Sequence, residues 1–536
     1  MIPMLKNVKS KNRIQKLYFV GINKNDMVTD NEIVDGYNLD TNNLPAMSPR
    51  KPKEVLIGTI ITPNGFTLYK DKVAYQDGAL LMYDGSSLGA IADSFKSFET
   101  FNKELIIMPD KKYFDGTTLD SLQGTIYIER GDLDEDGIVI LDENKVRTRG
   151  HIMVVGGETL TFSNTESYDH DVYEFDKDFE FIKVTTGLVG SKTVQSDTEY
   201  VKMVLVGSDV NVSLTVNTTK GYPSEGELPN VISVVEHYNR LFGIKENSIY
   251  ASAWSDKDNW AYFQGLDNDS WAIDTRSAGD FLAITNYQNH VVFFKENEMM
   301  ELYGYNPSDF QLQKISEVGA INQQSVCEYN SVLYFISKDD IYAYSGGIPR
   351  SISEKLNIDT IEDGAITASK DKVYVSFTQN GTDYTNYVYD IKNGAWLPLD
   401  TKQILQFKKY KGEIYALTVD GNIEKYDSGV ESILWGFTTK KYNDGSYNNK
   451  VTTKMRFRMK MEYNSLIKIF IKYDQGEWEL KESITNFDDK EDQKLLQIVL
   501  APQRHQIFQI KLECHGKSII WGEREVYEVG DRNVKT

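Results

Sequence analysis

FTLYKDKVAYQDGALLMYDGSSL, residues 66–88, and FKSFETFNKELIIMPDKKYFDGTTL, residues 95–119, contain the same structural unit twice. In each copy an apolar strand leads through a tight polar turn into further strands, and an aromatic residue followed by Asp-Gly comes near the end. Asp-Gly suits tight hairpins because Gly tolerates a positive φ and Asp hydrogen-bonds to its own backbone. Such a unit, returning every ~25–40 residues, is typical of the blades of a β-propeller.

The unit returns five more times after an interruption. The later copies occupy residues 231–254, 282–305, 325–347, 366–399 and 404–429. Seven copies lie within the range of propellers, so the sequence predicts an all-β fold with a propeller of about seven blades. An irregular stack of antiparallel meanders is the alternative that the same pattern leaves open.

Two segments depart from this repeat. Residues 124–226 are rich in Thr and Val and are predicted to form a separate β-domain inserted between blades. Residues 431–536 are predicted to form a C-terminal β-sandwich, since VTTKMRFRMKMEY (451–463) alternates apolar and charged residues and describes a strand with one wet face. The remaining ranges are then an N-terminal arm with the first propeller strand (1–60) and propeller blades over 61–123 and 227–430.

Composition narrows the classes of function. The chain has 536 residues, 40% of them hydrophobic, which is enough for more than one core. Its formal net charge of −20 disfavours tight binding to nucleic acid, which depends on neutralising phosphates with Lys and Arg. An acidic wall is still compatible with a channel through which DNA must pass without being bound.

The chain has few features of a secreted or membrane protein. The basic residues between Lys6 and Lys16 are not followed by a continuous apolar stretch, so no signal peptide is predicted, and the segment is interpreted as a solvated tail. No apolar run reaches the ~20 residues needed to span a bilayer. Cys327 and Cys514 are too far apart for a disulfide framework or a zinc site and are predicted to be small buried apolar residues.

The segment DLDEDGIVILDE, residues 132–143, has the spacing of a calcium-binding loop. Asp132, Asp134, Asp136 and Glu143 provide carboxylates at the positions that an EF-hand uses, and Gly137 stands at the bend. Both flanks are predicted to be strands rather than helices, however, and an Asp-rich turn in a β-hairpin would account equally well for this sequence. Calcium is the one cofactor that the sequence suggests.

Enzymatic motifs are absent from the sequence. No G-x-S-x-G or H-E-x-x-H pattern occurs, and Cys514 and His515 alternate to opposite faces of their predicted strand. A carboxylate pair for glycoside hydrolysis depends on three-dimensional separation, which sequence does not give. The tryptophans are assigned to the core in preference to sugar stacking: Trp254, Trp260, Trp271 and Trp396. We therefore expect a protein that is not an enzyme.

Two segments carry a resemblance to a known family. GINKNDMVTDNEIVDGYNLDTNNLPAMSPRKP (21–52), with Asn38 and Arg50 to Pro52 in its turn, and HYNRLFGIKENSIYASAWSDKDNW (237–260) resemble phage tail proteins of the tail nozzle type, also called tail tubular protein B, and the related packaged-DNA stabilisation proteins. The similarity covers roughly residues 17–120 and 230–430, and its motifs are patterns of strands and turns.

The resemblance implies a structural virion protein made in the host cytoplasm and placed in the tail. By this resemblance, copies would form a hexameric ring below the portal and adaptor proteins, around a channel through which double-stranded DNA passes without specific binding. No catalytic residue transfers from the family. The alternatives are a host-glycan-binding protein at the tail tip, which would use exposed aromatic residues, and a polysaccharide-degrading propeller.

Overall fold

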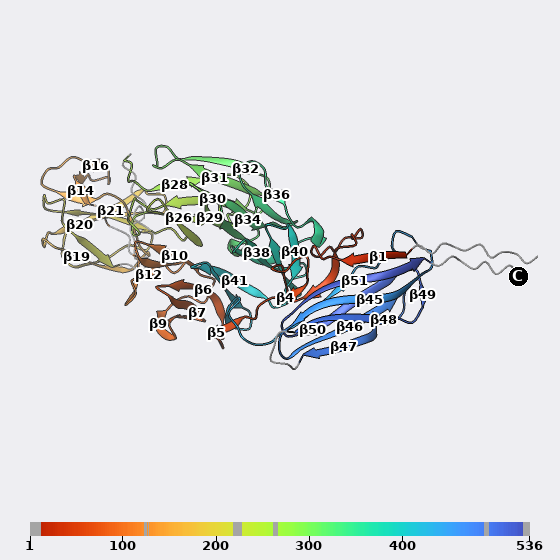
Figure 1. Ribbon diagram of the computed structural model, residues 1–536. Coiled ribbons are helices and arrows are strands. Elements are labelled where there is room, and N and C mark those ends of the chain that lie inside the picture. The colour runs from red at the N-terminus through yellow and green to blue at the C-terminus, as the bar shows by residue number, and fades with distance from the viewer. Residues whose placement is uncertain are drawn as a thin grey trace, which may run out of the picture.

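The computed structural model describes residues 12–122, 126, 128–217, 228–260, 266–446, 448–486 and 492–528. Within these ranges the chain consists of strands and loops, and its helical parts are two 3₁₀ turns, η1 (Gln323–Ser325) and η2 (Glu354–Leu356). Figure 1 shows three β-units in a row, with the inserted unit at one end, the propeller in the middle and the sandwich at the other end. The predicted fold class is confirmed.

The propeller has seven blades, each an antiparallel sheet of four strands. The first two precede the inserted unit: β6 (Pro63–Tyr69), β7 (Lys72–Asp77), β8 (Leu80–Tyr83) and β9 (Ser86–Ala90), then β10 (Ser97–Phe101), β11 (Glu104–Met108), β12 (Lys112–Phe114) and β13 (Leu119–Ser121). The third and fourth follow it: β25 (Ser233–His237), β26 (Arg240–Lys245), β27 (Ser248–Ala251) and β28 (Trp271–Asp274), then β29 (Ala283–Tyr287), β30 (His290–Lys295), β31 (Glu298–Tyr303) and β32 (Gln311–Ser316).

The last three blades complete the set that the sequence repeat predicts. They are β33 (Val326–Tyr329), β34 (Val332–Ile336), β35 (Ile341–Tyr344) and β36 (Arg350–Ser351), then β37 (Asp363–Ser369), β38 (Lys372–Thr378), β39 (Tyr384–Asp390) and β40 (Ala395–Pro398), and finally β41 (Ile404–Tyr410), β42 (Glu413–Thr418) and β43 (Ile423–Lys425) with β5 (Glu54–Ile57). Strand β5 comes from the N-terminal arm and pairs with β43, so the two ends of the propeller sequence close one blade together.

The innermost strands form a closed circle. In the order β6, β10, β25, β29, β33, β37 and β41, each contacts the next, and β41 contacts β6. Side chains join neighbouring blades in the same way twice: the hydroxyl of Tyr410 donates to Asp71 Oδ1 at 3.0 Å, and that of Tyr329 donates to Asp371 Oδ1 at 3.2 Å. Asp71 and Asp371 both have positive φ in two-residue turns after the innermost strand, a conformation that matches the twist of the strands that such a turn connects.

The inserted unit has its own sheets and its own core. One sheet contains β14 (Ile128–Arg130), β17 (Val146–Thr148), β18 (Ile152–Met153), β20 (His170–Phe175), β21 (Phe181–Leu188) and β23 (Tyr200–Leu205), and a second contains β19 (Thr159–Asn164), β22 (Ser191–Thr193) and β24 (Leu214–Asn217). A small hairpin is formed by β15 (Asp132–Leu133) and β16 (Val139–Ile140). The buried residues form a cluster separate from the propeller, including Val172, Val201, Met203 and Leu205.

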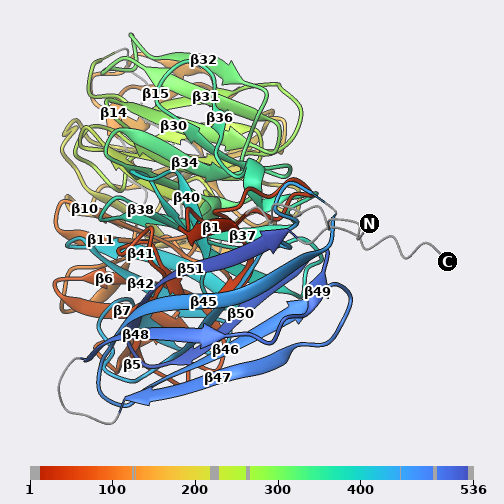
Figure 2. The ribbon, with the colours of Figure 1, turned by 45° about the vertical axis from the view of Figure 1, so that its right-hand side comes forward.

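The sandwich consists of two sheets. The first contains β1 (Asn12–Leu17), β51 (Ser518–Glu528), β45 (Lys450–Met461), β48 (Asp492–Val499) and β49 (Arg504–His505). The second contains β2 (Ile33–Tyr37), β44 (Leu434–Thr439), β50 (Phe508–His515), β46 (Ser465–Tyr473) and β47 (Glu479–Asn486). Figure 2 shows β1 next to β51 in the first sheet. The N-terminal arm therefore contributes one strand to each sheet.

The interpretation of the whole basic N-terminal segment as a solvated tail is wrong for its second half. Residues from Asn12 onward pair with β51, and Gln15 and Leu17 are buried. The cause is a partner far away in sequence, since Asn12 lies opposite Tyr527 and no local pattern indicates this pairing. Residues 1–11 lie outside the described part of the chain.

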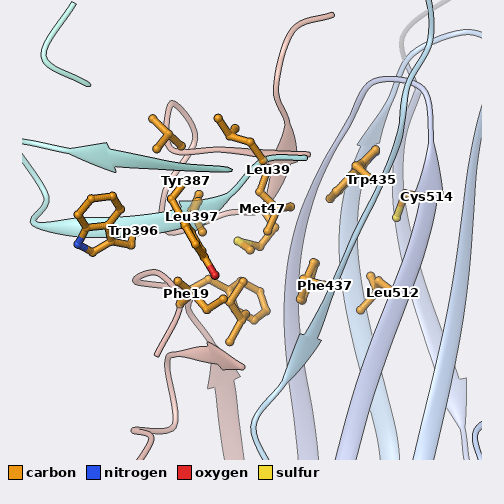
Figure 3. Packing of buried hydrophobic residues seen from close by; sticks show 14 of the residues in the cluster. Phe19, Leu39, Met47, Tyr387, Trp396, Leu397, Trp435, Phe437, Leu512 and Cys514 are labelled. Carbon is orange, nitrogen blue, oxygen red and sulfur yellow. The ribbon is translucent and has the colours of Figure 1, made fainter. Parts of the chain in front are cut away.

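One hydrophobic core runs from the propeller into the sandwich (Figure 3). Trp396 and Leu397 of β40 lie on the propeller side, Phe437 of β44 lies on the sandwich side, and Phe19 of the N-terminal arm packs between these elements. The rings of Phe19 and Phe437 meet edge to face with centroids 4.9 Å apart. Because this core contains residues of both units, continuous close packing joins the propeller to the sandwich.

Candidate functional sites

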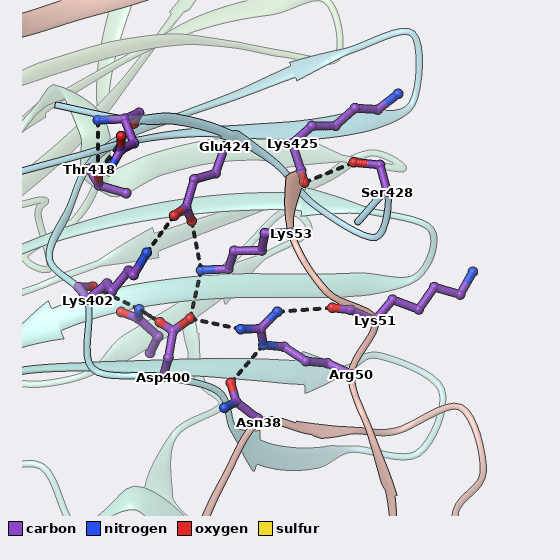
Figure 4. Close-up of polar contacts among 12 residues, drawn as sticks. Asn38, Arg50, Lys51, Lys53, Asp400, Lys402, Thr418, Glu424, Lys425 and Ser428 are labelled. Atoms are coloured by element: carbon purple, nitrogen blue, oxygen red, sulfur yellow. Dashed lines mark hydrogen bonds and ion pairs between the residues drawn. The ribbon is translucent and has the colours of Figure 1, made fainter. Parts of the chain in front are cut away.

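The residues that carry the family resemblance in the N-terminal arm form a buried ionic network (Figure 4). Arg50 donates from Nε to Oδ1 of Asn38 at 2.9 Å and from a terminal nitrogen to Asp400 at 3.2 Å. Lys53 lies 2.8 Å from the same Asp400 carboxylate and 3.4 Å from Glu424. The network therefore connects the arm to the last two blades of the propeller.

The charges in this network are held in their ionised forms. Burial opposes the charge on Lys53, but the Tyr426 ring, Asp400 and Glu424 raise the pKa of its ammonium above its ordinary value. Burial likewise opposes ionisation of Asp400, and Lys53 and Arg50 bring the pKa of that carboxyl below its ordinary value. All these charges have partners within the protein, so the network stabilises the contact between the N-terminal arm and the propeller and is not a site for a ligand.

Asn38 extends the network to the sandwich. Its φ of 56° is in the left-handed region that Asn adopts more readily than most residues. Its backbone N–H donates to Leu399 O at 2.7 Å in the propeller, and its side-chain amide donates to Leu434 O at 2.8 Å at the start of β44. A single residue of the arm therefore contacts the propeller, the sandwich and Arg50.

Arg240, in the second segment that carries the family resemblance, also forms hydrogen bonds within the protein. The residue is 1% exposed, and its guanidinium donates to the backbone oxygens of Ser252 at 3.0 Å, Asp267 and Asp269. The hydroxyl of Ser252 accepts a hydrogen bond from Leu241 N at 3.0 Å. These contacts hold the long connection between β27 and β28 against the blade.

The proposed calcium residues lie on the β15–β16 hairpin. Asp134 closes its turn by accepting hydrogen bonds from the backbone N–H groups of Asp136 at 3.0 Å and Ile138 at 2.9 Å. Asp132 is instead ion-paired with Lys145 at 2.8 Å, and Glu143 is exposed. Within the described ranges, no group of three or more His, Cys, Asp or Glu side chains is arranged to hold a metal ion. The segment thus forms the hairpin that the alternative interpretation predicts.

A polar cavity of about 190 Å³ lies at the propeller axis between the innermost strands. Glu99 of β10 and Lys408 of β41 line it together with Thr285 and Gln323. Burial raises the pKa of Glu99 to about 7; the positive charge of Lys408 acts against this rise, and the negative charge of Glu236 adds to it. Burial lowers the pKa of Lys408, although the negative charge of Glu99 acts in the opposite direction. Sequence reasoning missed this pair because its members come from blades far apart in the chain.

A groove crosses the outer face of the first sandwich sheet. Its volume is about 570 Å³, and its lining combines cationic, aromatic and aliphatic side chains with one acid: Lys16, Tyr18, Arg456, Arg458, Leu495, Trp521 and Glu523. The Arg458 guanidinium lies 5.8 Å from the centre of the Trp521 ring. We call this the sandwich groove. The alternation in residues 451–463 predicts a wet face here, but the aromatic partner comes from another strand.

The remaining candidates divide between core and surface. Trp260 and Trp396 are buried and Trp271 is partly buried, as predicted, whereas Trp254 is 56% exposed and the prediction that it belongs to the core is wrong. Cys514 is buried and Cys327 is half-buried, and neither forms a disulfide. No helix in the part of the chain that the structure describes is long and apolar enough to cross a membrane.

Comparisons with known proteins give a likeness in fold and little more. No family model and no curated protein matches the chain. Similar solved structures include an exo-β-1,3-galactanase from Phanerochaete chrysosporium (8% identity, TM-score 0.22, covering 56% of this chain and 97% of that one). Another is a glycoside hydrolase family 43 arabinoxylan arabinofuranohydrolase from Bacillus subtilis (7% identity, TM-score 0.22, covering 69% and 94%). Both are glycoside hydrolases, and TM-scores this low carry no argument about the function of this chain.

Proposed function

We propose that the chain is a structural subunit of a phage tail, of the nozzle or tail-hub type, that assembles with other copies into a ring around the DNA channel. The proposal rests on how the residues that carry the family resemblance are bonded within the fold. Asn38, Arg50 and Arg240 are fixed to neighbouring elements of the same chain, which is the role expected of a motif that specifies architecture.

The propeller axis does not provide a path for DNA. The cavity found there, of about 190 Å³, has room for on the order of six water molecules at ~30 Å³ each, which is far too small for a duplex. A channel wide enough for a duplex would therefore have to lie between copies, as in a ring built from one repeated contact. The net charge of −20 favours a wall that does not retain phosphates.

The test is the mass and shape of the purified protein, alone and mixed with the products of neighbouring genes. Light scattering should give a ring-sized assembly, alone or with one partner, and electron microscopy should show a central opening. A monomer that ignores every tail protein would overturn the proposal.

A polysaccharide-degrading protein is the second candidate, and Glu99 is the observation that favours it. A carboxyl with a pKa of about 7 suits general acid catalysis near neutral pH, and Glu236 is a second acid close enough to influence it. Release of reducing sugar from capsule or cell-wall polysaccharide, lost in Glu99→Gln, would support this function. No turnover by the intact protein on these polymers would eliminate it.

A further inference from the structure

We propose that the sandwich groove binds the β15–β16 hairpin of a second copy of this chain. The contact would join the sandwich end of one molecule to the inserted end of the next. It goes beyond the proposed function, because it names the two surfaces that meet and does not depend on the assembly belonging to a tail.

The sandwich groove has the composition of a protein-binding surface. Trp, Tyr and Arg are the residues most enriched among those that dominate binding energy, and Trp521, Tyr18 and Arg458 lie together here. Leu495 beside them is 75% exposed. Burying such side chains against a partner gives a favourable hydrophobic contribution that the single molecule lacks.

The charge on this face differs from that of the whole molecule. The outward-facing positions of β1, β45 and β51 include five cations, Lys16, Lys454, Arg456, Arg458 and Lys460, against two anions, Glu523 and Glu525. Arg456 is ion-paired with Glu523 at 2.8 Å, and Arg456 and Lys454 each lie 3.9 Å from Glu525, so five cations against two anions give these positions a formal charge of +3. In a chain of net charge −20, an acidic partner fits this face best.

The acidic partner is present in the chain itself. Residues 128–217 contain eighteen acidic and eight basic residues, a net charge of −10, whereas residues 434–528 contain fourteen acidic and sixteen basic residues, a net charge of +2. Figure 1 places these two units at opposite ends of the molecule. Opposite charges at opposite ends favour a head-to-tail contact and disfavour the meeting of two like ends.

The hairpin matches the sandwich groove in detail. Val139 and Leu141 are 49% and 98% exposed and stand at alternate positions, which in an extended strand point to the same face, so together they form an apolar ridge. Acidic residues border the ridge on both sides, with Glu135 and Asp136 before it and Asp142 and Glu143 after it. Within the described residues β16 pairs with β15 alone, so its other edge is open. An apolar ridge with an acidic rim complements an aromatic groove with a basic rim, and gives the DLDEDGIVILDE segment a role.

The experiment uses full-length variants in which each surface is reversed. Arg458→Glu with Leu495→Glu reverses the groove, and Glu135→Lys with Leu141→Lys reverses the hairpin. All four side chains are exposed, so the fold should persist, which circular dichroism checks. Lys472→Glu with Leu480→Glu is the matched control, because it makes the same change on β46 and β47 of the other sandwich sheet.

Light scattering over a range of concentrations at low salt is the measurement. We expect the unmodified protein and the control to associate, and each reversed variant to weaken association by roughly tenfold or more. Mixing the two reversed variants should restore one contact and give a dimer. Added salt should weaken the contact in the unmodified protein.

Three results would overturn the inference. These are an unmodified protein that stays monomeric, reversed variants that assemble normally, and a mixture of reversed variants that does not associate. If the reversed groove instead loses binding to DNA or to an acidic polysaccharide while assembly is unchanged, the groove is a polyanion site. Reversed variants that still enter a tail complex would contradict this contact and leave the proposed function standing.

Discussion

Nε of Arg50 lies 2.9 Å from Oδ1 of Asn38, so two residues of the N-terminal motif are bonded to each other as well as to the rest of the protein. The same guanidinium pairs with Asp400 in the propeller, and the amide of Asn38 donates to the sandwich. The motif therefore connects the propeller to the sandwich.

Asp400→Asn should destabilise the protein by about 3 kcal/mol, because it leaves Lys53 and Arg50 buried beside a neutral side chain. The unfolding free energy from urea denaturation is the measurement. Lys392→Ala is the control, since it breaks an exposed ion pair with Asp371 and should cost less than ~1 kcal/mol. An equal loss of unfolding free energy in the two variants would show that the buried network contributes no more to stability than an exposed ion pair.

Phe437→Ala should lower one unfolding transition that the propeller and the sandwich share, at a cost of about 3–5 kcal/mol for a buried aromatic residue. The inserted unit, with its own core, should keep its transition temperature. Calorimetry with a probe in each unit checks both statements. Separate melting of sandwich and propeller would contradict joint unfolding through the shared core of Figure 3.

Calcium should leave the melting temperature of the inserted unit unchanged, since the Asp132 carboxylate is paired with Lys145 and that of Asp134 closes the turn. Asp134→Ala removes two hydrogen bonds and should cost about 1–3 kcal/mol, at about 0.5–1.5 kcal/mol for each bond, with or without calcium. A calcium-dependent rise in melting temperature that this variant abolishes would restore the loop as a metal site.

The repeat was predictable because its signals are local. Each blade repeats a strand, a turn and a strand within a few tens of residues, and the Lys-Asp turns at 70–71 and 370–371 recur at the same place in their blades, with Asp tolerating the positive φ. The places of β1, β2 and β5 were not predictable, since Ile57 pairs with Ile423 and Asn12 with Tyr527. Nothing near these residues indicates their partners.

The same distinction holds for the candidate sites. Alternation in residues 451–463 predicts which side of β45 is wet, and its charged residues are all basic up to Glu462. That Arg458 meets Trp521 depends on the register between β45 and β51, which only the folded structure provides. Glu99 and Lys408 likewise share a cavity only because the propeller closes.

Glu99 should make the propeller less stable as pH rises toward neutrality. Its folded pKa of about 7 exceeds the ordinary value of 4.5, so between these values the folded state keeps a proton that the unfolded state has lost. The contribution is full below pH 4.5 and is lost as pH rises through 7. Glu99→Gln should remove this dependence and be more stable than the unmodified protein at pH 8. A parallel pH profile for both proteins, measured by thermal melting, would contradict the assignment.

His151 should give the inserted unit the opposite dependence. Its ring lies 4.9 Å from Phe175 and 4.8 Å from Phe179 between ring centres, and burial, assisted by Lys202, lowers its pKa to about 4. Because this value is below the ordinary 6.5, the unfolded state takes up a proton first as pH falls. The contribution of His151 is therefore full above pH 6.5 and is lost as pH falls toward 4. His151→Phe keeps the aromatic packing and should weaken the pH dependence of the inserted unit, leaving the part due to His170, whose pKa burial also lowers, while the profile of the propeller persists. If melting at pH 5 destabilises both units of the unmodified protein equally, the two residues do not control these transitions.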